Sequence, residues 1–190
     1  ALGKDALDDA YKKLVLSFDK QNGGFGRAPK FPKPHNMLFL LRYWNRTKQK
    51  TALKMIEKTL RAMRLGGIFD QLGFGFHRYS TDAEWVVPHF EKMLYDNAQL
   101  AVLYLDAAAL YHSSRYRATG LETVEFMLRD MLTDEGAFIG SFSAVDSQGR
   151  EGAYYLWTSE QLKNLLTDQE YAAVQAAWLG GAPADSEYGY

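Results

Sequence analysis

The sequence predicts an all-α fold in which αα-hairpins form an inner and an outer layer of helices. Apolar residues recur at helical spacing through most of the 190 residues. Some helical segments are apolar nearly all round, whereas others carry one apolar stripe, as buried and surface helices do. The connections alternate between short polar turns and long aromatic loops. Because short connections join the two helices of a hairpin, the long loops should all emerge at the same end.

The helices are expected over residues 4–20, 35–44, 51–65, 89–112, 115–132, 158–166 and 168–179. Segments 35–44 and 89–112 are apolar on nearly every face and should lie in the interior. Segments 51–65 and 115–132 carry a single stripe and should form the outer layer. Thr158 or Ser159 is the expected N-cap of the sixth helix.

The long connections cover residues 21–34, 66–88 and 133–157, and the short ones cover 45–50 and 112–115. The long loops begin with "GGF", "GGIF" and "EGAF", which is a weak internal repeat of αα units. Inside them, "FGFHRY" (74–79) and "AYYLW" (153–157) predict short strands, so we expect small β-hairpins at one end of the helices.

The composition of the chain excludes several classes of function. The net charge is −1 and no run of basic residues occurs, so nucleic acid is not an expected partner. No apolar run approaches the length of a membrane span, and no signal-peptide pattern opens the chain. Cysteine is absent, which excludes disulfides, thiolate catalysis and cysteine metal sites. We expect a cytoplasmic protein that contacts no membrane.

Residues 66–100 hold the densest group of candidate site residues, in "GGIFDQLGFGFHRYSTDAEWVVPHFEKMLYDNAQL". Loops at one end of a helical scaffold often carry binding residues. Aromatic faces stack on the C–H face of sugar rings, and carboxylates, Arg, His and Asn hold hydroxyl groups. An apolar wall with a few convergent polar groups is the general form of a ligand pocket.

This stretch resembles the signature of a family of thioredoxin-domain-containing proteins that includes spermatogenesis-associated proteins and many bacterial relatives. "GGFGRAPKFPKP" and "FSAVDSQGREGAYYLWT" look like two further blocks of that family. The resemblance implies a thioredoxin-like domain followed by an (α/α)6 toroid similar to those of N-acylglucosamine 2-epimerases and six-hairpin glycosidases.

Two features depart from that family pattern. The chain carries no thioredoxin-like domain, and it has about seven predicted helices where a closed toroid needs six hairpins. We therefore expect residues 1–190 to form a single partial domain of about half an (α/α)6 toroid. Half a toroid exposes the faces of inner helices, so self-association through these faces is expected.

Four residues are candidate catalytic groups: Asp70, His77, His89 and Asp146. A loop carboxylate can act as general acid or base, and Asp70 can equally cap a turn. Epimerases of similar fold use paired histidines, which His77 and His89 could supply, although a structural His is the alternative. Asp146 could join a carboxylate pair in a hydrolase, or it could simply belong to a polar turn.

Seven residues are candidate substrate-binding groups: Phe76, Arg78, Tyr79, Trp85, Glu91, Asp96 and Asn97. On an expected helix starting near Pro88, His89 and Asp96 share a face. The alternatives stay open: Arg78 can brace a carboxylate, Glu91 can cap the helix, and Asp96 or Asn97 can brace the adjacent loop. "DSQGRE" lacks the spacing of a calcium loop, so neither a metal nor another cofactor is expected.

Two functions from different classes remain open at this point. The first is a carbohydrate-active domain that isomerises or hydrolyses a small sugar or glycan. The second is a non-catalytic module, linked to a thioredoxin-like domain, that binds a sugar or a protein. Fold similarity alone does not decide between them, because one fold hosts many functions.

Overall fold

The computed structural model describes residues 3–179, which form two compact units that meet at the Ser143–Ala144 bond. The first unit contains α1 (Lys4–Ser17), α2 (Pro34–Thr47), α3 (Lys50–Leu65), α4 (Leu94–Tyr111), α5 (Ser114–Phe126) and the π-helical turn η1 (Met127–Met131). Its strands are β1 (Tyr79–Ser80), β2 (Pro88–His89), β3 (Lys92–Met93) and β4 (Ser141–Phe142). The second unit contains α6 (Ser159–Leu165), α7 (Asp168–Val174) and the π-helical turn η2 (Gln175–Leu179).

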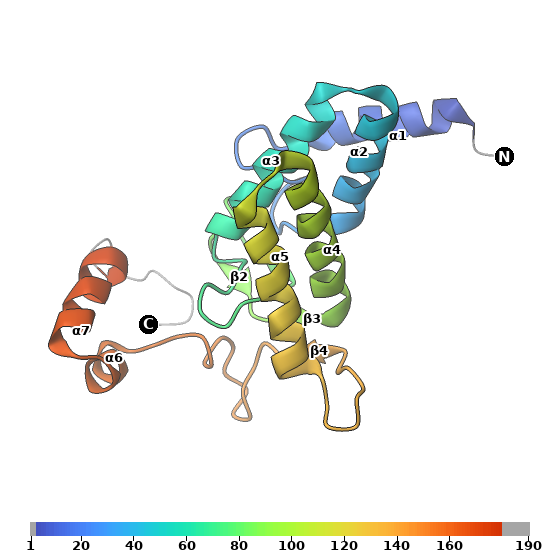
Figure 1. Ribbon diagram of the computed structural model, residues 1–190. Helices are drawn as coiled ribbons and strands as arrows, with labels where there is room; N and C mark the ends of the chain where they lie inside the picture. The colour runs from blue at the N-terminus through green and yellow to red at the C-terminus, as the bar shows by residue number, and fades with distance from the viewer. Residues whose placement is uncertain (1–2, 180–190) are drawn as a thin grey trace. The chain divides into compact units, whose positions relative to one another are not determined.

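The predicted all-α hairpin architecture is confirmed. The helices α2 and α3 form one hairpin and α4 and α5 form another, each closed by a short turn (Figure 1). Lys48 and His112 adopt the left-handed conformation at the ends of α2 and α4, which lets the chain reverse within two residues. The short turns lie at the upper end of Figure 1, whereas β2, β3 and β4 lie lower.

The core of the first unit follows the predicted apolar stripes. On α3 the buried residues are Ala52, Met55, Ile56, Thr59, Leu60 and Met63, at the i, i+3, i+4, i+7 spacing of one helix face. They pack with buried residues of α2 and α4. The Tyr104 hydroxyl of α4 donates to the Leu60 carbonyl at 2.7 Å, so the two hairpins are joined by a buried hydrogen bond as well as by packing.

The long connections meet one another as predicted. The 21–34 and 66–88 loops join at the Lys30–Ser80 bridge, where each backbone N–H donates to the other residue's carbonyl. Within the second loop, β1 and β2 form a small antiparallel hairpin, and β3 pairs with β4 from the connection after η1. The short β-hairpin expected in this loop is therefore present, and it lies at the loop end of the helical layer.

In the first unit, an isolated β-bridge closes each of the three turns that follow α1, α3 and η1. The bridged pairs are Phe18–Phe25, Phe69–Phe76 and Leu132–Phe138. In the first two turns, the side chain of Asp19 or Asp70 accepts hydrogen bonds from two backbone N–H groups. This recurrence gives structural support to the glycine-aromatic repeat noticed in the sequence.

Three predicted elements differ from the structure. The helix expected over 89–112 begins only at Leu94, because the preceding residues pair as β2 and β3. The strand expected over 74–79 is wrong for its first half, since Phe74 and Gly75 both have positive φ angles. The strand expected over 153–157 is absent, and a turn occupies its start. In the second unit, Thr158 is the N-cap of α6 in a capping box with Gln161.

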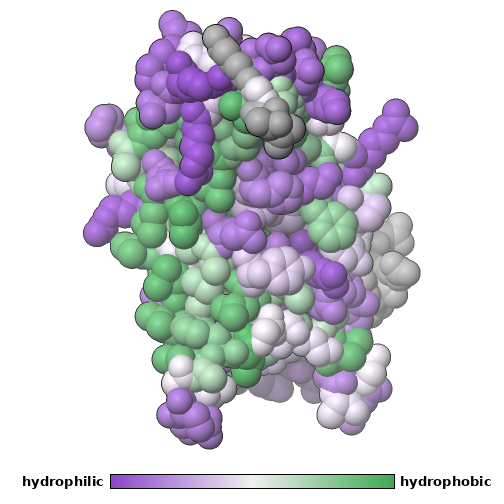
Figure 2. Space-filling view, turned by 90° about the vertical axis from the view of Figure 1, so that its right-hand side faces the viewer, coloured by the Kyte–Doolittle hydropathy of each residue, from purple (hydrophilic) through white to green (hydrophobic). Residues whose placement is uncertain are grey.

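One face of α4 is exposed, although the segment was expected to be buried all round. Val102 is 52% exposed, and Leu121 and Leu128 on the α5–η1 side are 43% and 53% exposed. Figure 2 shows apolar side chains gathered over this α4–α5 edge. Among the described residues, no helix is both long enough and apolar enough to cross a membrane.

Candidate functional site

The β1–β2 hairpin brings several predicted site residues together. Tyr79 and His89 lie opposite each other in the antiparallel register, and their rings stack with centroids 4.8 Å apart and planes at 12°. The Phe31 ring also packs against Tyr79, with ring centroids 4.8 Å apart and planes at 36°. Stacked rings of this kind present an aromatic wall with polar edges.

Arg78 and Glu91 extend this aromatic wall with a charged pair. The Arg78 guanidinium donates to Glu91 Oε2 at 2.7 Å, and the Arg78 backbone N–H donates to the Glu91 carbonyl at 2.8 Å. His89 Nε2 lies 3.5 Å from the same carboxylate oxygen. Glu91 first, and then the nearby Tyr95, raise the pKa of Arg78. Glu91 therefore connects Arg78 and His89 into one polar group.

Asp96 lies in the first turn of α4, close enough to Arg78 for their charges to interact. Its side chain is nearly buried, with the residue 9% exposed, and it makes no hydrogen bond or ion pair with any described residue. Burial raises its pKa to about 6, and the positive charge of Arg78 offsets only part of that effect. A carboxyl group with this pKa can both accept and release a proton near neutral pH.

We refer to Arg78, Tyr79, His89, Glu91 and Asp96 as the loop-end cluster. All five were predicted from the sequence as site residues, but one argument that connected them is wrong. His89 and Asp96 do not share a helix face, because His89 belongs to β2 and only Asp96 belongs to α4. They approach the cluster from two different elements.

Asp70 and His77 lie in the interior instead of the cluster. Asp70 caps its own turn and accepts from Lys92 Nζ at 2.7 Å. The His77 ring is 2% exposed and packs edge-on against Phe90, with centroids 5.5 Å apart. Burial first, and then the charge of Lys92, lower the pKa of His77 to about 3, so its imidazole is neutral at pH 7. Phe76 is buried as well, so neither residue faces solvent.

The remaining predicted site residues make structural contacts. Phe76 and Trp85 are fully buried in the core, and the Trp85 indole N–H donates to the Asn22 carbonyl at 3.0 Å. The Asn97 amide accepts from the Phe76 N–H at 2.7 Å and donates to the Phe76 carbonyl at 3.0 Å. In the second unit, Asp146 closes a turn and its carboxylate binds Arg150.

Two buried lysines hold the loops that carry the cluster. Lys92 Nζ donates to Asp70 and to the Phe74 carbonyl, both at 2.7 Å, and lies 4.5 Å over the Phe126 ring. Lys30 is bound in the same way by Asp19 and by two backbone carbonyls, over the Trp85 ring.

The sequence assigned no role to Lys92 or Tyr95. The available signal for the lysines was the repeated Phe–Asp pair, in which Asp19 and Asp70 each precede a glycine turn. Nothing in the pattern of Tyr95 separated it from other helix residues. Within residues 3–179, no three His, Asp or Glu side chains are grouped so that they could hold a metal ion.

The fold is that of toroid enzymes. The chain matches cellobiose 2-epimerase from Bacillus thermoamylovorans with a TM-score of 0.63 at 11% identity, over 73% of this chain and 40% of that one. Cellobiose 2-epimerase from Spirochaeta thermophila matches at 0.60, and a family 76 glycoside hydrolase from Bacteroides thetaiotaomicron at 0.52, each at 16% identity. These matches are (α/α)6 toroids, and the partial coverage agrees with about half of such a toroid.

Among curated proteins, the chain is 40% identical over 182 residues to spermatogenesis-associated protein 20 of Homo sapiens, and 39% identical to its Mus musculus counterpart. An uncharacterized protein of Caenorhabditis elegans is 36% identical over 184 residues. The chain spans about a quarter of the length of these relatives, 23% for the human protein. No family model matches the chain.

Proposed function

We propose that this chain contributes a carbohydrate-active site, with acid–base chemistry at the loop-end cluster. The observation that carries the proposal is Asp96, an almost buried carboxyl group without a protein partner, beside an aromatic wall and a charged pair. Burial of an unpaired carboxylate costs stability, so such a group is often kept for function. The sugar-epimerase and glycoside-hydrolase folds of the structural neighbours favour a sugar as the ligand.

Each member of the cluster has a defined role in this proposal. The stacked rings of Tyr79 and His89 support the apolar face of a sugar ring. Arg78 and Glu91, fixed by their mutual hydrogen bond, orient two hydroxyl groups as donor and acceptor. Asp96 exchanges a proton with the carbon or hydroxyl group that reacts.

A binding test separates the cluster from the interior. Saturation-transfer NMR of the chain with hexoses, N-acylhexosamines and uronic acids should show contact with at least one sugar. Asp96→Asn and Tyr79→Ala should weaken that signal. Asp106→Asn is the matched control, since Asp106 is exposed on the same helix and lies outside the cluster. Equal loss of signal in the control would contradict the assignment of the site.

Turnover is tested separately, in D2O. An epimerase removes the proton at the carbon next to the sugar carbonyl, so a bound sugar should incorporate deuterium there. In Asp96→Asn this exchange should fall by roughly a hundredfold or more, as expected for loss of a general base. A parent protein that binds sugar but incorporates no deuterium and cleaves no glycoside would disprove the catalytic proposal.

The non-catalytic alternative has one observation in its favour. Acid–base catalysis usually needs two proton-transfer groups, and the structure turns Asp70 and His77 inward, where each has its own structural contacts. Within the cluster, burial moves the pKa of Asp96 toward neutrality, which supplies one proton-transfer group. A sugar-binding module would bind through the same cluster, lose affinity in Tyr79→Ala, and show no deuterium incorporation.

A further inference from the structure

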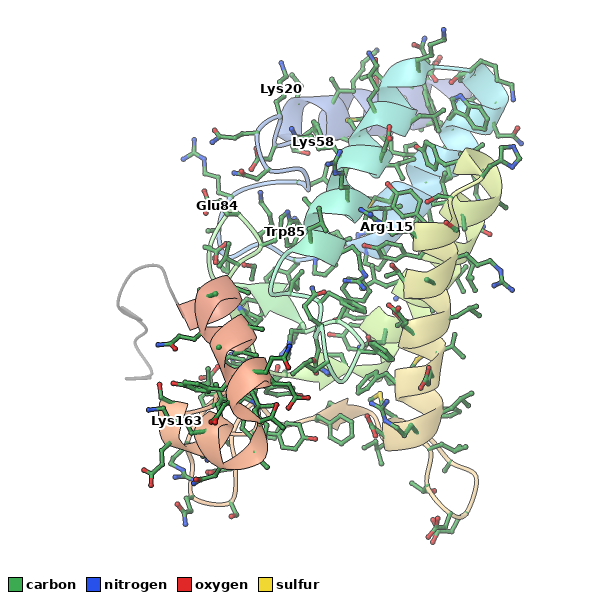
Figure 3. All side chains as sticks on the ribbon, turned by 60° about the vertical axis from the view of Figure 1, so that its left-hand side comes forward. Lys20, Lys58, Glu84, Trp85, Arg115 and Lys163 are labelled. Carbon is green, nitrogen blue, oxygen red and sulfur yellow. The ribbon has the colours of Figure 1, made fainter. Side chains whose placement is uncertain are left out.

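A second candidate site lies away from the loop-end cluster. A groove of about 700 Å³ runs along the outer side of α3, between the turn after α1 and the 81–87 loop. Figure 3 shows Lys58 on one side of this region and Glu84 and Trp85 on the other. No residue of the loop-end cluster lines the groove. Its volume lies within the range of ordinary ligand sites.

The α3 wall of this groove carries three unpaired cations. Lys54, Lys58 and Arg61 occupy positions i, i+4 and i+7, so they share one helix face. All three are exposed, and none makes a hydrogen bond or ion pair with a described residue. Several arginines elsewhere in the first unit are paired with carboxylates, as Arg64 is with Glu122. The α3 wall therefore presents free positive charge.

Two glutamates also line the groove, and neither forms an ion pair with the three cations. Glu57 lies on α3 itself. Burial of Tyr111 and Tyr116 is the main cause of their raised pKa values, and the negative charge of Glu57 is the second cause. Glu84 comes from the opposite side and forms no ion pair with Lys58. With three cations and two anions, the lining keeps an excess of positive charge on the α3 side.

The far end of the groove is apolar. Leu65, at the last position of α3, and Val86, in the 81–87 loop, are each 60% exposed. Both line the groove beyond Arg61. A complementary ligand would therefore be anionic over most of its length and apolar at one end.

We propose that the α3 groove binds an acidic peptide segment in an extended conformation. Lys54 and Lys58 are separated by about 6 Å along the helix axis, at about 1.5 Å per residue. Alternate side chains of an extended strand are separated by about 6.6 Å, at about 3.3 Å per residue, and point to the same side. Carboxylates at alternate positions can therefore follow the α3 wall, and an apolar residue that follows them reaches Leu65 and Val86. A single small anion would contact only part of the row.

The test uses a fluorescein-labelled ten-residue peptide in which glutamate alternates with serine and two leucines follow, measured by fluorescence anisotropy. The parent chain should bind it saturably, and binding should weaken as salt is added. Lys58→Glu should weaken binding by roughly tenfold or more, because it replaces an attraction with a repulsion. Lys50→Glu is the matched control, with the same change of charge at an exposed position of α3 outside the groove.

Further variants and competitors test the two halves of the proposal. Val86→Ser should weaken binding of this peptide but not of one that has serine in place of leucine. Circular dichroism should show that each variant keeps the parent's helical content. The proposal is overturned if the parent shows no saturable binding, if Lys50→Glu loses as much affinity as Lys58→Glu, or if a lysine-containing peptide binds equally. An oligonucleotide that binds as tightly as the peptide would also overturn it, by making the groove a general polyanion site.

Discussion

Lys92 and Asp70 form an ion pair in the interior, with 2.7 Å between Nζ and Oδ2 and side-chain exposures of 2% and 13%. Burial alone would raise the pKa of Asp70, but the charge and hydrogen bond of Lys92 lower it. Burial lowers the pKa of Lys92, and Asp70 offsets part of this effect. The pair joins the turn after α3 to β3, which directly precedes the α4 turn that carries Asp96.

Removing one partner of this pair should be strongly destabilising. In Lys92→Met the Asp70 carboxylate keeps its turn but loses its buried counter-charge, and such losses cost about 3–5 kcal/mol. Urea unfolding followed by circular dichroism measures the change in the free energy of unfolding. Lys50→Met, at an exposed position of α3, should change it by less than about 0.5 kcal/mol. A similar small effect in Lys92→Met would show that the pair does not hold the loop.

His77 should make the protein sensitive to acid. Its folded pKa of about 3 lies below the ordinary histidine value of 6.5, so the unfolded chain takes up a proton first as the pH falls. The neutral imidazole is compatible with the fold above pH 6.5, and stability is lost progressively as the pH falls toward about 3. Each unit of pKa difference corresponds to about 1.4 kcal/mol, so the loss is on the order of several kcal/mol.

The measurement compares the parent with His77→Gln over this pH range. Glutamine does not titrate, so the stability of the parent relative to the variant should decline as the pH falls from 6.5 toward 4. Asp96 acts in the opposite direction over part of this window, because its folded pKa is raised. Asp96 is present in both proteins, so its contribution cancels in the difference between their free energies of unfolding. Parallel stability curves for the two proteins would exclude His77 as the acid-sensitive group.

The helices were predictable because their signals are local. The stripe on α3 and the capping box of Thr158 depend on residues within a few positions of each other. The start of α4 was not predictable in this way. Pro88 resembles a helix N-terminus, but β2 pairs with β1 across the 81–87 loop, and β3 pairs with Ser141 and Phe142, which lie far away in sequence. Long-range pairing of this kind leaves no periodic signal.

The sequence could predict which stretch holds the candidate site, but not which of its residues form the loop-end cluster and which are buried in the core. The 66–100 stretch does contain the loop-end cluster, because its aromatics and charges exceed what a connection needs. Sequence alone could not separate half-buried Arg78 from buried His77, since the two are adjacent and both polar. The positive φ angles of Phe74 and Gly75 just before them, which no local pattern predicted, interrupt the expected strand.

The exposed α4–α5 edge should support self-association. Beside Val102 and Leu121 lie exposed charged residues, among them Asp106 on α4 and Arg117 on α5, neither of which forms an ion pair with a described residue. We predict that two copies pack through this edge in a two-fold arrangement that brings Asp106 of each copy to Arg117 of the other. Sedimentation velocity over a concentration series should show a dimer.

Val102→Glu should return the protein to a monomer, because it places a charge in the centre of this face. Leu16→Glu introduces the same charge at a residue that is 86% exposed on α1, and it should leave the dimer intact. A parent protein that sediments as a monomer at every concentration would contradict the prediction.

Asp96→Asn should stabilise the protein while weakening function. Burial raises the folded pKa of Asp96 from 3.8 to about 6, so ionising it above pH 6 opposes folding. The shift of roughly two units corresponds to at most about 3 kcal/mol, at about 1.4 kcal/mol per unit. A neutral amide avoids this cost, so the variant should be more stable than the parent at pH 7. The difference should narrow as the pH falls from 6 toward 3.8, where the folded parent becomes protonated.

Asp106→Asn, at an exposed position of the same helix, is the control and should change stability by less than about 0.5 kcal/mol at either pH. A residue kept for structure lowers stability when it is replaced, whereas a residue kept for function can raise it. If Asp96→Asn is less stable than the parent at pH 7, Asp96 holds the fold through contacts of its own, and its place in the proposed site is lost.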